Sequence, residues 1–154
     1  MQVNYQHGKD VNATVCGSMW RCLCCGKTLD KVPEPMKCPN CGLVLGRTRA
    51  TKEKYRILKE ICKLNDYDLF IDACAGSGKV QVNGKLIDGS PPILYRIAQR
   101  KTPPARCVFI EFDQKTFRLL KWRFSRGMNA QFIWGDCNEH LLKLIDGRTP
   151  TLVY

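Results

Sequence analysis

The chain has 154 residues, of which 44% are hydrophobic and 25% are charged, so a packed core is expected and a wholly disordered protein is excluded. Its formal net charge is +11, and the basic residues concentrate at 47–63 and 96–126. An excess of this size favours polyanionic partners, nucleic acid first. A solvated basic surface that binds nothing is the alternative, because net charge identifies no site.

Hydrophobic segments that would direct the chain out of the cytoplasm are missing from the sequence. No apolar run approaches the roughly 18 residues of a membrane span. The N-terminus has no apolar run after a basic start, so no secretory signal is visible. We therefore expect a cytoplasmic protein without membrane contact. In such a reducing compartment the ten cysteines are expected to bind metal rather than form disulfides.

Changes in composition divide the chain into three segments. Residues 1–15 are polar and lack periodicity, which predicts a flexible arm. Residues 16–46 hold a cysteine repeat with Gly and Pro and no helical period, which predicts a small zinc ribbon. Residues 51–154 alternate between strand and helix patterns and are expected to form an α/β domain.

The α/β segment begins with an amphipathic helix predicted over 51–64, with Thr51 as its candidate cap. A mostly apolar strand and a Gly-rich turn follow at 68–79. The Asn-Gly pair within 80–87 predicts an inserted hairpin, because a type I′ turn needs positive φ at both central residues. SPPILYRIAQR at 90–100 predicts a helix with Ser90 at its N-cap.

The same alternation continues to Tyr154. The further expected elements are a strand at 106–113, a helix at 114–126 capped by Asp113, a strand at 130–136, a helix at 138–147 and a strand starting at 150. This order predicts the parallel sheet with flanking helices of a partial Rossmann-like fold. Because a parallel strand at the very end would leave an open sheet edge, we expect the chain to be truncated.

RCLCCG at residues 21–26 and KCPNCG at residues 37–42 are two copies of one motif, each ending in C-x2-C-G. In each copy two thiolates can bind one ion, and the following Gly permits a positive φ. Two copies predict a closed four-cysteine structural site for zinc, favoured over iron. It resembles the rubredoxin-like zinc ribbons. The expected ligands are Cys22, Cys25, Cys38 and Cys41. Cys24 lies inside the first motif and Cys16 is expected to be a free thiol.

DACAGSG at residues 72–78 ends the first strand with a Gly-rich turn that a cofactor could approach closely. A P-loop is excluded because residue 73 is Ala and residue 80 is Val. A dinucleotide fingerprint is disfavoured because its third Gly position holds Gln81, and because a hairpin separates the turn from the next acid. The third interpretation is a site for S-adenosylmethionine.

In this third interpretation the chain resembles the class I (Rossmann-like) methyltransferases. Their first motif matches Asp72–Gly78, their second matches the acid Glu111, and their third matches Asp136. The ribose diol and adenine amine of the cofactor donate hydrogen bonds, and carboxylates accept them. The alternative is that these acids cap helices, which we prefer for Asp113. The resemblance implies cofactor-binding residues at Asp72, Ala73, Cys74, Gly76, Gly78, Glu111, Phe112, Asp136 and Cys137.

Cys74 stands where many methyltransferases have Gly. DACAGSG, IDGSP at residues 87–91 and TKEKYRIL before the first strand together resemble a narrower group, the three-Cys-motif partner proteins, over residues 51–154. Their fold is methyltransferase-like. The fourth methyltransferase motif, which faces the methyl group, would lie beyond Tyr154, so no catalytic residue is assigned.

The sequence thus predicts the N-terminal part of a zinc-binding, S-adenosylmethionine-dependent methyltransferase-like protein that acts on or with nucleic acid. It would be an enzyme if the C-terminal half of the domain is present. The alternative is a non-catalytic zinc-ribbon module that contacts nucleic acid or a protein partner and keeps a relict cofactor pocket.

Overall fold

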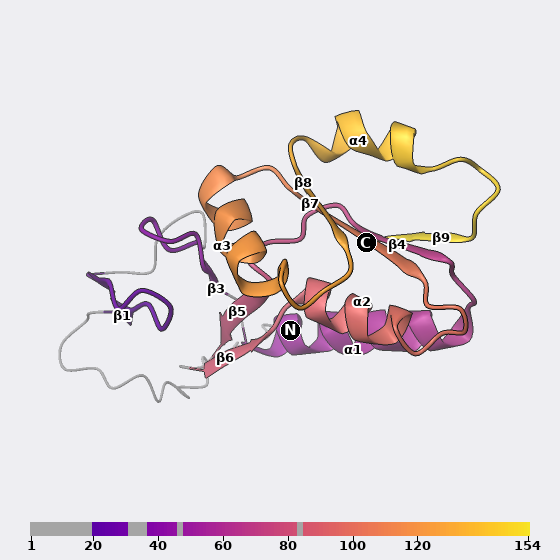
Figure 1. Ribbon diagram of the computed structural model, residues 1–154. Helices are drawn as coiled ribbons and strands as arrows, with labels where there is room; N and C mark the ends of the chain where they lie inside the picture. The colour runs from indigo at the N-terminus through magenta and orange to yellow at the C-terminus, as the bar shows by residue number, and fades with distance from the viewer. Residues whose placement is uncertain (1–19, 31–36, 46–47, 83–84) are drawn as a thin grey trace, which may run out of the picture.

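A four-stranded parallel sheet with helices on both faces forms the larger part of the molecule (Figure 1). The computed structural model describes residues 20–30, 37–45, 48–82 and 85–154. The predicted arm at 1–15 and Cys16 lie outside the described residues. The sheet has the order β8-β7-β4-β9, and all its neighbouring strands are parallel. Its strands are β4 (Leu69–Asp72), β7 (Arg106–Glu111), β8 (Gln131–Trp134) and β9 (Thr151–Val153).

The two central strands, β4 and β7, carry apolar side chains on both faces of the sheet, so both faces need a covering layer. Phe70 and Phe109 point to a face covered by α1 (Thr48–Leu64), α2 (Ser90–Ala98) and α3 (Gln114–Phe124). Ile71 and Ile110 point to the other face, which α4 (Cys137–Leu144) covers. Figure 1 shows α4 on one side of the sheet and α1 and α2 on the other. The predicted α/β fold class is confirmed.

A hairpin leaves this sheet between β4 and α2. Its strands β5 (Lys79–Val82) and β6 (Lys85–Asp88) are antiparallel, as the Asn-Gly pair predicts. The chain leaves the hairpin next to the residue where it entered, because the Gly89 amide donates to the Gly78 carbonyl at 2.9 Å. The insertion therefore leaves α2 starting beside the Gly-rich turn.

The two predicted helix caps before α3 behave differently from expectation. Helix α1 begins at Thr48, so Thr51 lies inside it and is not its cap. Gly89 occupies the N-cap of α2, and Ser90 is its first helical residue. Ser90 lies one residue after the cap, and Thr51 lies three residues after the first helical residue of α1, because several neighbouring residues could have served as caps. Asp113 does cap α3, and its side chain accepts from the Thr116 amide.

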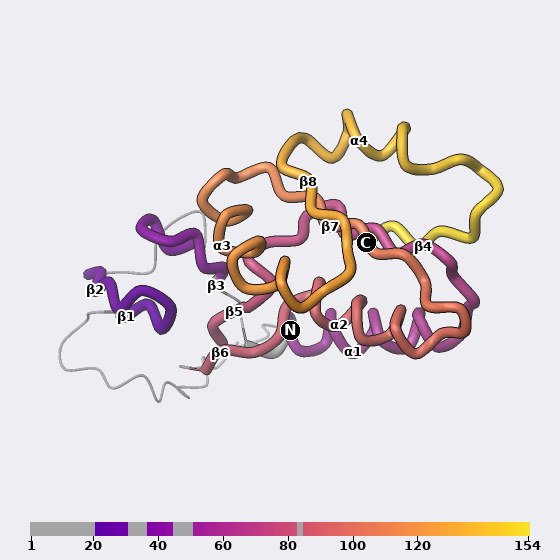
Figure 2. The backbone as a smooth tube through the Cα atoms, viewed as in Figure 1, coloured from indigo at the N-terminus to yellow at the C-terminus, as the bar shows by residue number. Residues whose placement is uncertain are grey.

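The cysteine motifs form a separate small unit of short strands. β1 (Trp20–Arg21) pairs antiparallel with β2 (Thr28–Leu29), and β3 (Val44–Leu45) follows the second motif. β3 pairs in parallel with β5 of the hairpin, so the ribbon and the hairpin share one three-stranded sheet. Figure 2 shows this unit beside the hairpin and α3.

Buried side chains complete the attachment of the ribbon. The Gln81 carboxamide accepts from the Leu23 amide at 2.9 Å and donates to the Arg21 carbonyl at 3.0 Å. On the other motif, the Thr116 hydroxyl donates to the Gly42 carbonyl at 3.3 Å. Both motifs are thus tied to the α/β domain, one through β5 and the other through α3.

The two motif glycines allow a matched test of this attachment. Gly26 and Gly42 have φ of 74° and 75°, so alanine at either position is strained by about 1–2 kcal/mol. A Cβ on Gly42 would also lie 2.9 Å from the Thr116 amide nitrogen, whereas the nearest atom to one on Gly26 is an Arg21 guanidinium nitrogen at 3.8 Å.

We expect Gly42→Ala to lower the free energy of unfolding of the metal-loaded chain by about 1–3 kcal/mol more than Gly26→Ala does, because the ribbon must move off α3. Urea unfolding followed by circular dichroism measures the difference. Equal losses in the two variants would show that the contact between Gly42 and α3 contributes nothing.

Candidate metal centre and ligand-binding edge

Four cysteine thiols converge between the two motifs. The Sγ atoms of Cys22, Cys25, Cys38 and Cys41 all lie within 4.8 Å of one another. The Cys22–Cys41 and Cys25–Cys38 Sγ distances are both 3.7 Å. A tetrahedron with metal–sulfur bonds of about 2.3 Å has edges of about 3.8 Å. The four thiols could therefore hold a metal ion such as zinc, as the sequence predicts.

The backbone of each motif is folded in the same way. The Cys22 amide donates to the Lys27 carbonyl and the Gly26 amide to the Cys22 carbonyl, both at 2.9 Å. The second motif repeats these bonds, from Cys38 to Leu43 and from Gly42 to Cys38, at 2.9 Å and 2.8 Å. The repeat in sequence is thus a repeat in structure, and it aims both cysteine pairs at one point.

The acidities of the thiols differ within the cluster. Burial raises the pKa of Cys22 to about 11 and also raises that of Cys41. At Cys25 burial acts in the same direction, but hydrogen bonds from the Asn40 side chain and the Lys27 backbone lower its pKa to about 6. Since metal ligation needs thiolates, a bound cation would stabilise charge that burial otherwise disfavours.

Cys24 is not one of the four converging thiols. Its Sγ accepts a hydrogen bond from Arg123 of α3 at 3.1 Å. The same guanidinium donates to the carbonyl and hydroxyl oxygens of Ser77, at 3.2 and 3.3 Å. Arg123 thereby connects the first cysteine motif to the Gly-rich turn. The sequence offers no signal for this contact, because the three residues lie far apart in the chain.

The Gly-rich turn ends β4 and bends toward β7. Gly76 and Gly78 have φ of 61° and 70°, a conformation that favours glycine. A Cβ on Gly78 would meet the Phe124 ring at 2.1 Å, so this glycine also allows α3 to pack closely. The turn therefore serves packing as well as any ligand.

Asp72 ends β4 and is buried, with only 1% of its surface exposed. Its Oδ1 accepts from the Cys74 amide at 3.3 Å, and its Oδ2 has no hydrogen-bond partner among the described residues. Burial raises the pKa of Asp72 to about 6. The Tyr154 hydroxyl is likewise buried without a described partner. Two unsatisfied polar atoms at the carboxyl ends of the neighbouring strands β4 and β9 are the kind of exception that often marks a ligand or an ordered water.

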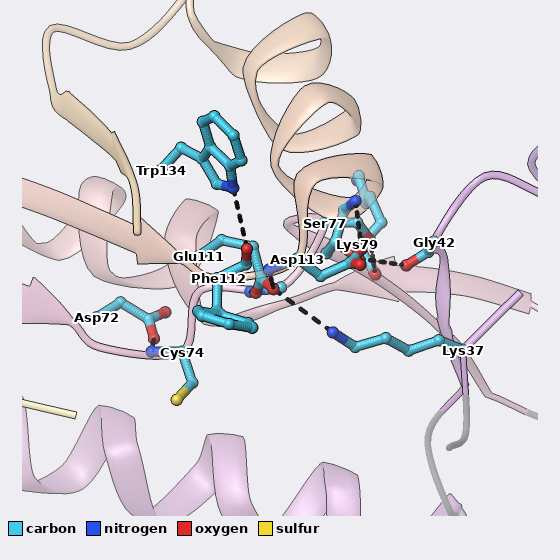
Figure 3. Close-up of polar contacts among 12 residues, drawn as sticks. Lys37, Gly42, Asp72, Cys74, Ser77, Lys79, Glu111, Phe112, Asp113 and Trp134 are labelled. Carbon is cyan, nitrogen blue, oxygen red and sulfur yellow. Dashed lines mark hydrogen bonds and ion pairs between the residues drawn. The ribbon is translucent and has the colours of Figure 1, made fainter. Parts of the chain in front are cut away.

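Glu111 ends β7 and is also buried (Figure 3). Its Oε2 accepts from the Gly76 amide at 2.8 Å. Its Oε1 accepts from the Asp113 amide at 2.9 Å and forms an ion pair with Lys37 Nζ at 3.4 Å. Glu111 thus joins the Gly-rich turn, the start of α3 and the second cysteine motif. Lys37 is a residue that sequence reasoning did not select.

The third acid, Asp136, follows β8 and caps α4 by accepting from the Asn138 amide at 2.9 Å. Two aromatic side chains lie nearby on the surface. Phe112 is 73% exposed and Trp134 is 54% exposed, and the Trp134 indole donates to the Phe112 carbonyl at 3.0 Å. Figure 3 shows them beside Glu111.

The remaining predicted residues also lie at this edge. Ala73 and the exposed Cys74 follow Asp72 in the turn. Cys137 is the first residue of α4, and its proximity helps to raise the pKa of the Cys74 thiol, after burial. The structure therefore brings the predicted ligand residues of three strands together along one edge of the sheet.

A cavity of about 440 Å³ lies at the opposite edge, at the amino ends of the strands, where Leu69, Arg106 and Gln131 line it. It contains none of the carboxylates described above. No helix in the described part of the chain is both long enough and apolar enough to cross a membrane. Comparison of the chain with protein-family models, curated proteins and solved structures finds no match.

Removing one metal ligand should abolish stoichiometric metal binding. We expect the purified chain to hold one zinc per molecule and Cys38→Ser to hold none, because three thiolates leave the tetrahedron open. Elemental analysis measures the metal content. Cys24→Ser is the control, since its hydroxyl still accepts from Arg123, and it should keep the metal. A folded wild-type chain without metal would contradict the assignment.

Replacing the buried Asp72 carboxylate should stabilise the protein at neutral pH. Its pKa is raised to about 6 in the folded chain against about 3.9 in the unfolded one, so ionisation costs the folded state roughly 3 kcal/mol. This cost starts as the pH rises above about 4 and is complete above about 6. We expect Asp72→Asn to gain about 2–3 kcal/mol at pH 8 and nothing at pH 4 in urea unfolding.

Asp113→Asn is the control for which the expected change in stability has the opposite sign. Hydrogen bonds from Thr116 lower the pKa of Asp113, so its carboxylate stabilises the folded state at neutral pH. This variant should lose stability at pH 8. If Asp72→Asn also lost stability there, Asp72 would instead be a satisfied structural residue.

Proposed function

We propose that this chain is a zinc-stabilised, methyltransferase-like protein that binds S-adenosylmethionine at the carboxyl edge of its parallel sheet and acts on nucleic acid. The proposal goes beyond the metal-ligand cluster and the α/β fold described above. It makes the chain a cofactor-binding protein whose methyl acceptor would approach the same edge.

The order of the sheet carries this proposal. In the order β8-β7-β4-β9, the strands β7 and β8 that follow β4 in the chain lie on one side of it, whereas β9 lies on the other side. The crevice beside the carboxyl end of β4 is therefore a topological switch point. Open α/β sheets bind their ligands at such points. The Gly-rich turn and the unsatisfied Oδ2 of Asp72 lie at this point.

The residue chemistry at this edge fits the cofactor. Asp72 would accept from the amino group of the methionine moiety, Glu111 from the ribose hydroxyls and Asp136 from the adenine amine. The exposed Phe112 offers an apolar surface for the adenine ring. Bound S-adenosylmethionine would supply an electrophilic methyl group on its sulfonium. No residue of the chain is assigned to methyl transfer itself.

The four-cysteine cluster would take zinc in a structural role. All four protein ligands are thiolates, which leaves no open coordination position for a substrate. Contacts from the two motifs reach the ligand edge through Lys37 at Glu111 and through Arg123 at Ser77. The metal would therefore hold the edge together without taking part in its chemistry.

A non-catalytic binding module is the second candidate, and the contacts of Glu111 favour it. Both oxygens of Glu111 already accept hydrogen bonds from backbone amides, and Lys37 Nζ pairs with one of them at 3.4 Å. Asp136 likewise serves as a helix cap. In this candidate the pocket is a relict, and the ribbon and basic helices contact a nucleic acid or a protein.

Calorimetric titration with S-adenosylmethionine tests the proposal. We expect one molecule bound per chain, with at least about tenfold weaker binding in Glu111→Gln and Asp136→Asn because each loses an ionised acceptor. Asp146→Asn is the matched control. That carboxylate also accepts two backbone amides, those of Arg148 and Thr149, but lies in the connection before β9. The Asp146→Asn variant should bind S-adenosylmethionine with the affinity of the wild-type chain.

Lys37→Ala separates the two candidates. If the Lys37 ammonium competes with the ligand for Glu111, its removal should strengthen binding of S-adenosylmethionine. If neither the wild-type chain nor this variant gives heat at millimolar ligand, the cofactor proposal fails and the binding module stands.

A further inference from the structure

Helices α1 and α2 run alongside each other on the outside of the sheet (Figure 1) and enclose a groove of about 320 Å³. Four cationic side chains and two isoleucines line it, and no carboxylate does: Lys59, Lys63, Ile93, Arg96, Ile97 and Arg100. The two isoleucines come from the face of α2 that also packs on the core. The groove is therefore apolar at its floor and positively charged at both walls.

The cations repeat along both walls. Lys59 and Lys63 are four residues apart on α1, and Arg96 and Arg100 are four residues apart on α2 and the turn after it. On α1 this spacing places Lys59 and Lys63 about 5–6 Å apart, and like charges at this distance destabilise a helix slightly.

Neighbouring acids neutralise only part of this charge. Lys63 pairs with Glu60 at 3.0 Å and Arg96 pairs with Asp88 at 2.7 Å. Lys59 and Arg100 form no ion pair with any residue that the structure describes. Each wall thus presents one cation whose charge the described chain leaves uncompensated.

The groove continues toward the ligand edge. A second hollow of about 380 Å³ shares Lys59, Ile93 and Arg96 with it, and its further charged lining includes Lys52, Arg56 and Glu60. This second hollow also reaches Asp88, one residue before Gly89, whose amide bonds the Gly-rich turn. A chain lying along the groove would therefore lead from the far end of α1 and α2 to the edge where Asp72 and Glu111 lie.

We propose that the groove between α1 and α2 binds the sugar-phosphate backbone of a single-stranded nucleic acid. Two rows of cations on opposite walls suit a polyanion that lies between them, with its phosphates on the walls and its sugars on the isoleucine floor. A single strand has one backbone to place between the two walls, whereas a duplex presents two backbones separated by a groove. This inference rests on the nucleic-acid partner of the proposed function and is independent of the cofactor.

Fluorescence anisotropy with an oligothymidylate of about 15 nucleotides tests the proposal on the metal-loaded full chain. We expect the double variant Lys59→Gln/Arg100→Gln to bind at least about tenfold more weakly at low salt. Its salt slope should fall by about 1.4, since each lost phosphate contact removes about 0.7 for a single strand. Both side chains are exposed and unpaired, so the fold should be retained, which the thermal midpoint checks.

Arg118→Gln/Lys121→Gln on α3 is the matched control, because it removes the same charge from exposed positions outside the groove. This control should bind the oligonucleotide almost as tightly as the wild-type chain. Equal losses in the two double variants would overturn the proposal, because net charge alone would then explain binding. Absence of binding at low salt would overturn it as well.

Two further measurements distinguish nucleic-acid binding in the groove from binding of an acidic protein and from the cofactor proposal. Polyglutamate should compete poorly with the oligonucleotide, and competition at equal charge would point to an acidic protein and overturn the proposal. Calorimetry with S-adenosylmethionine should give the same affinity for the groove variant as for the wild-type chain. The cofactor proposal can therefore fail while the groove still binds nucleic acid, and the reverse also holds.

Discussion

The parallel pairing of β3 with β5 is the interaction on which the rest of the structure depends. It joins a small unit, whose buried centre among the described residues consists of Leu43, Cys22 and Cys38, to the hairpin of the α/β domain. A unit of this size buries too little apolar surface to fold alone, so the attachment to a neighbour stabilises it and a metal at its four thiols would stabilise it further. The buried Gln81 completes the junction, because its carboxamide satisfies backbone groups of the first motif that strand pairing leaves open.

This junction determines the environment of the candidate ligand edge. Because the ribbon lies against the hairpin and α3, Lys37 reaches Glu111 and Arg123 reaches both Cys24 and Ser77. Glu111 is then held by the turn, by the start of α3 and by the ribbon. Asp72 differs from it, since the same burial leaves one of its oxygens without a described partner. The protein therefore provides partners for both oxygens of Glu111 but for only one oxygen of Asp72 among the described residues.

The basic groove and the ligand edge are related by the direction of the helices. The N-terminal halves of α1 and α2 lie near the carboxyl ends of the strands, since Lys54 Nζ lies 4.8 Å from the Tyr154 ring centroid and the Gly89 amide donates to the Gly78 carbonyl. A polymer in the groove between them would run toward that edge. The four-cysteine cluster, the carboxylates at the strand ends and the groove thus have separate residues, and the groove runs toward the end of the fold where the other two lie.

The sequence by itself determined what depends on local pattern. The C-x2-C-G repeat identifies the four converging thiols, and the apolar runs and turn residues predict the order of strands and helices. Both succeed because the backbone of each cysteine motif and the burial of each strand depend on residues that are neighbours in the sequence. The tertiary structure alone decided which side chains meet. Lys37 and Glu111 are 74 residues apart, and Gln81 lies 60 residues from Arg21, so no local pattern predicts these pairs. The groove has the same origin: its cations look like ordinary solvated residues on each helix, and only packing of α2 against α1 makes two rows of them face each other.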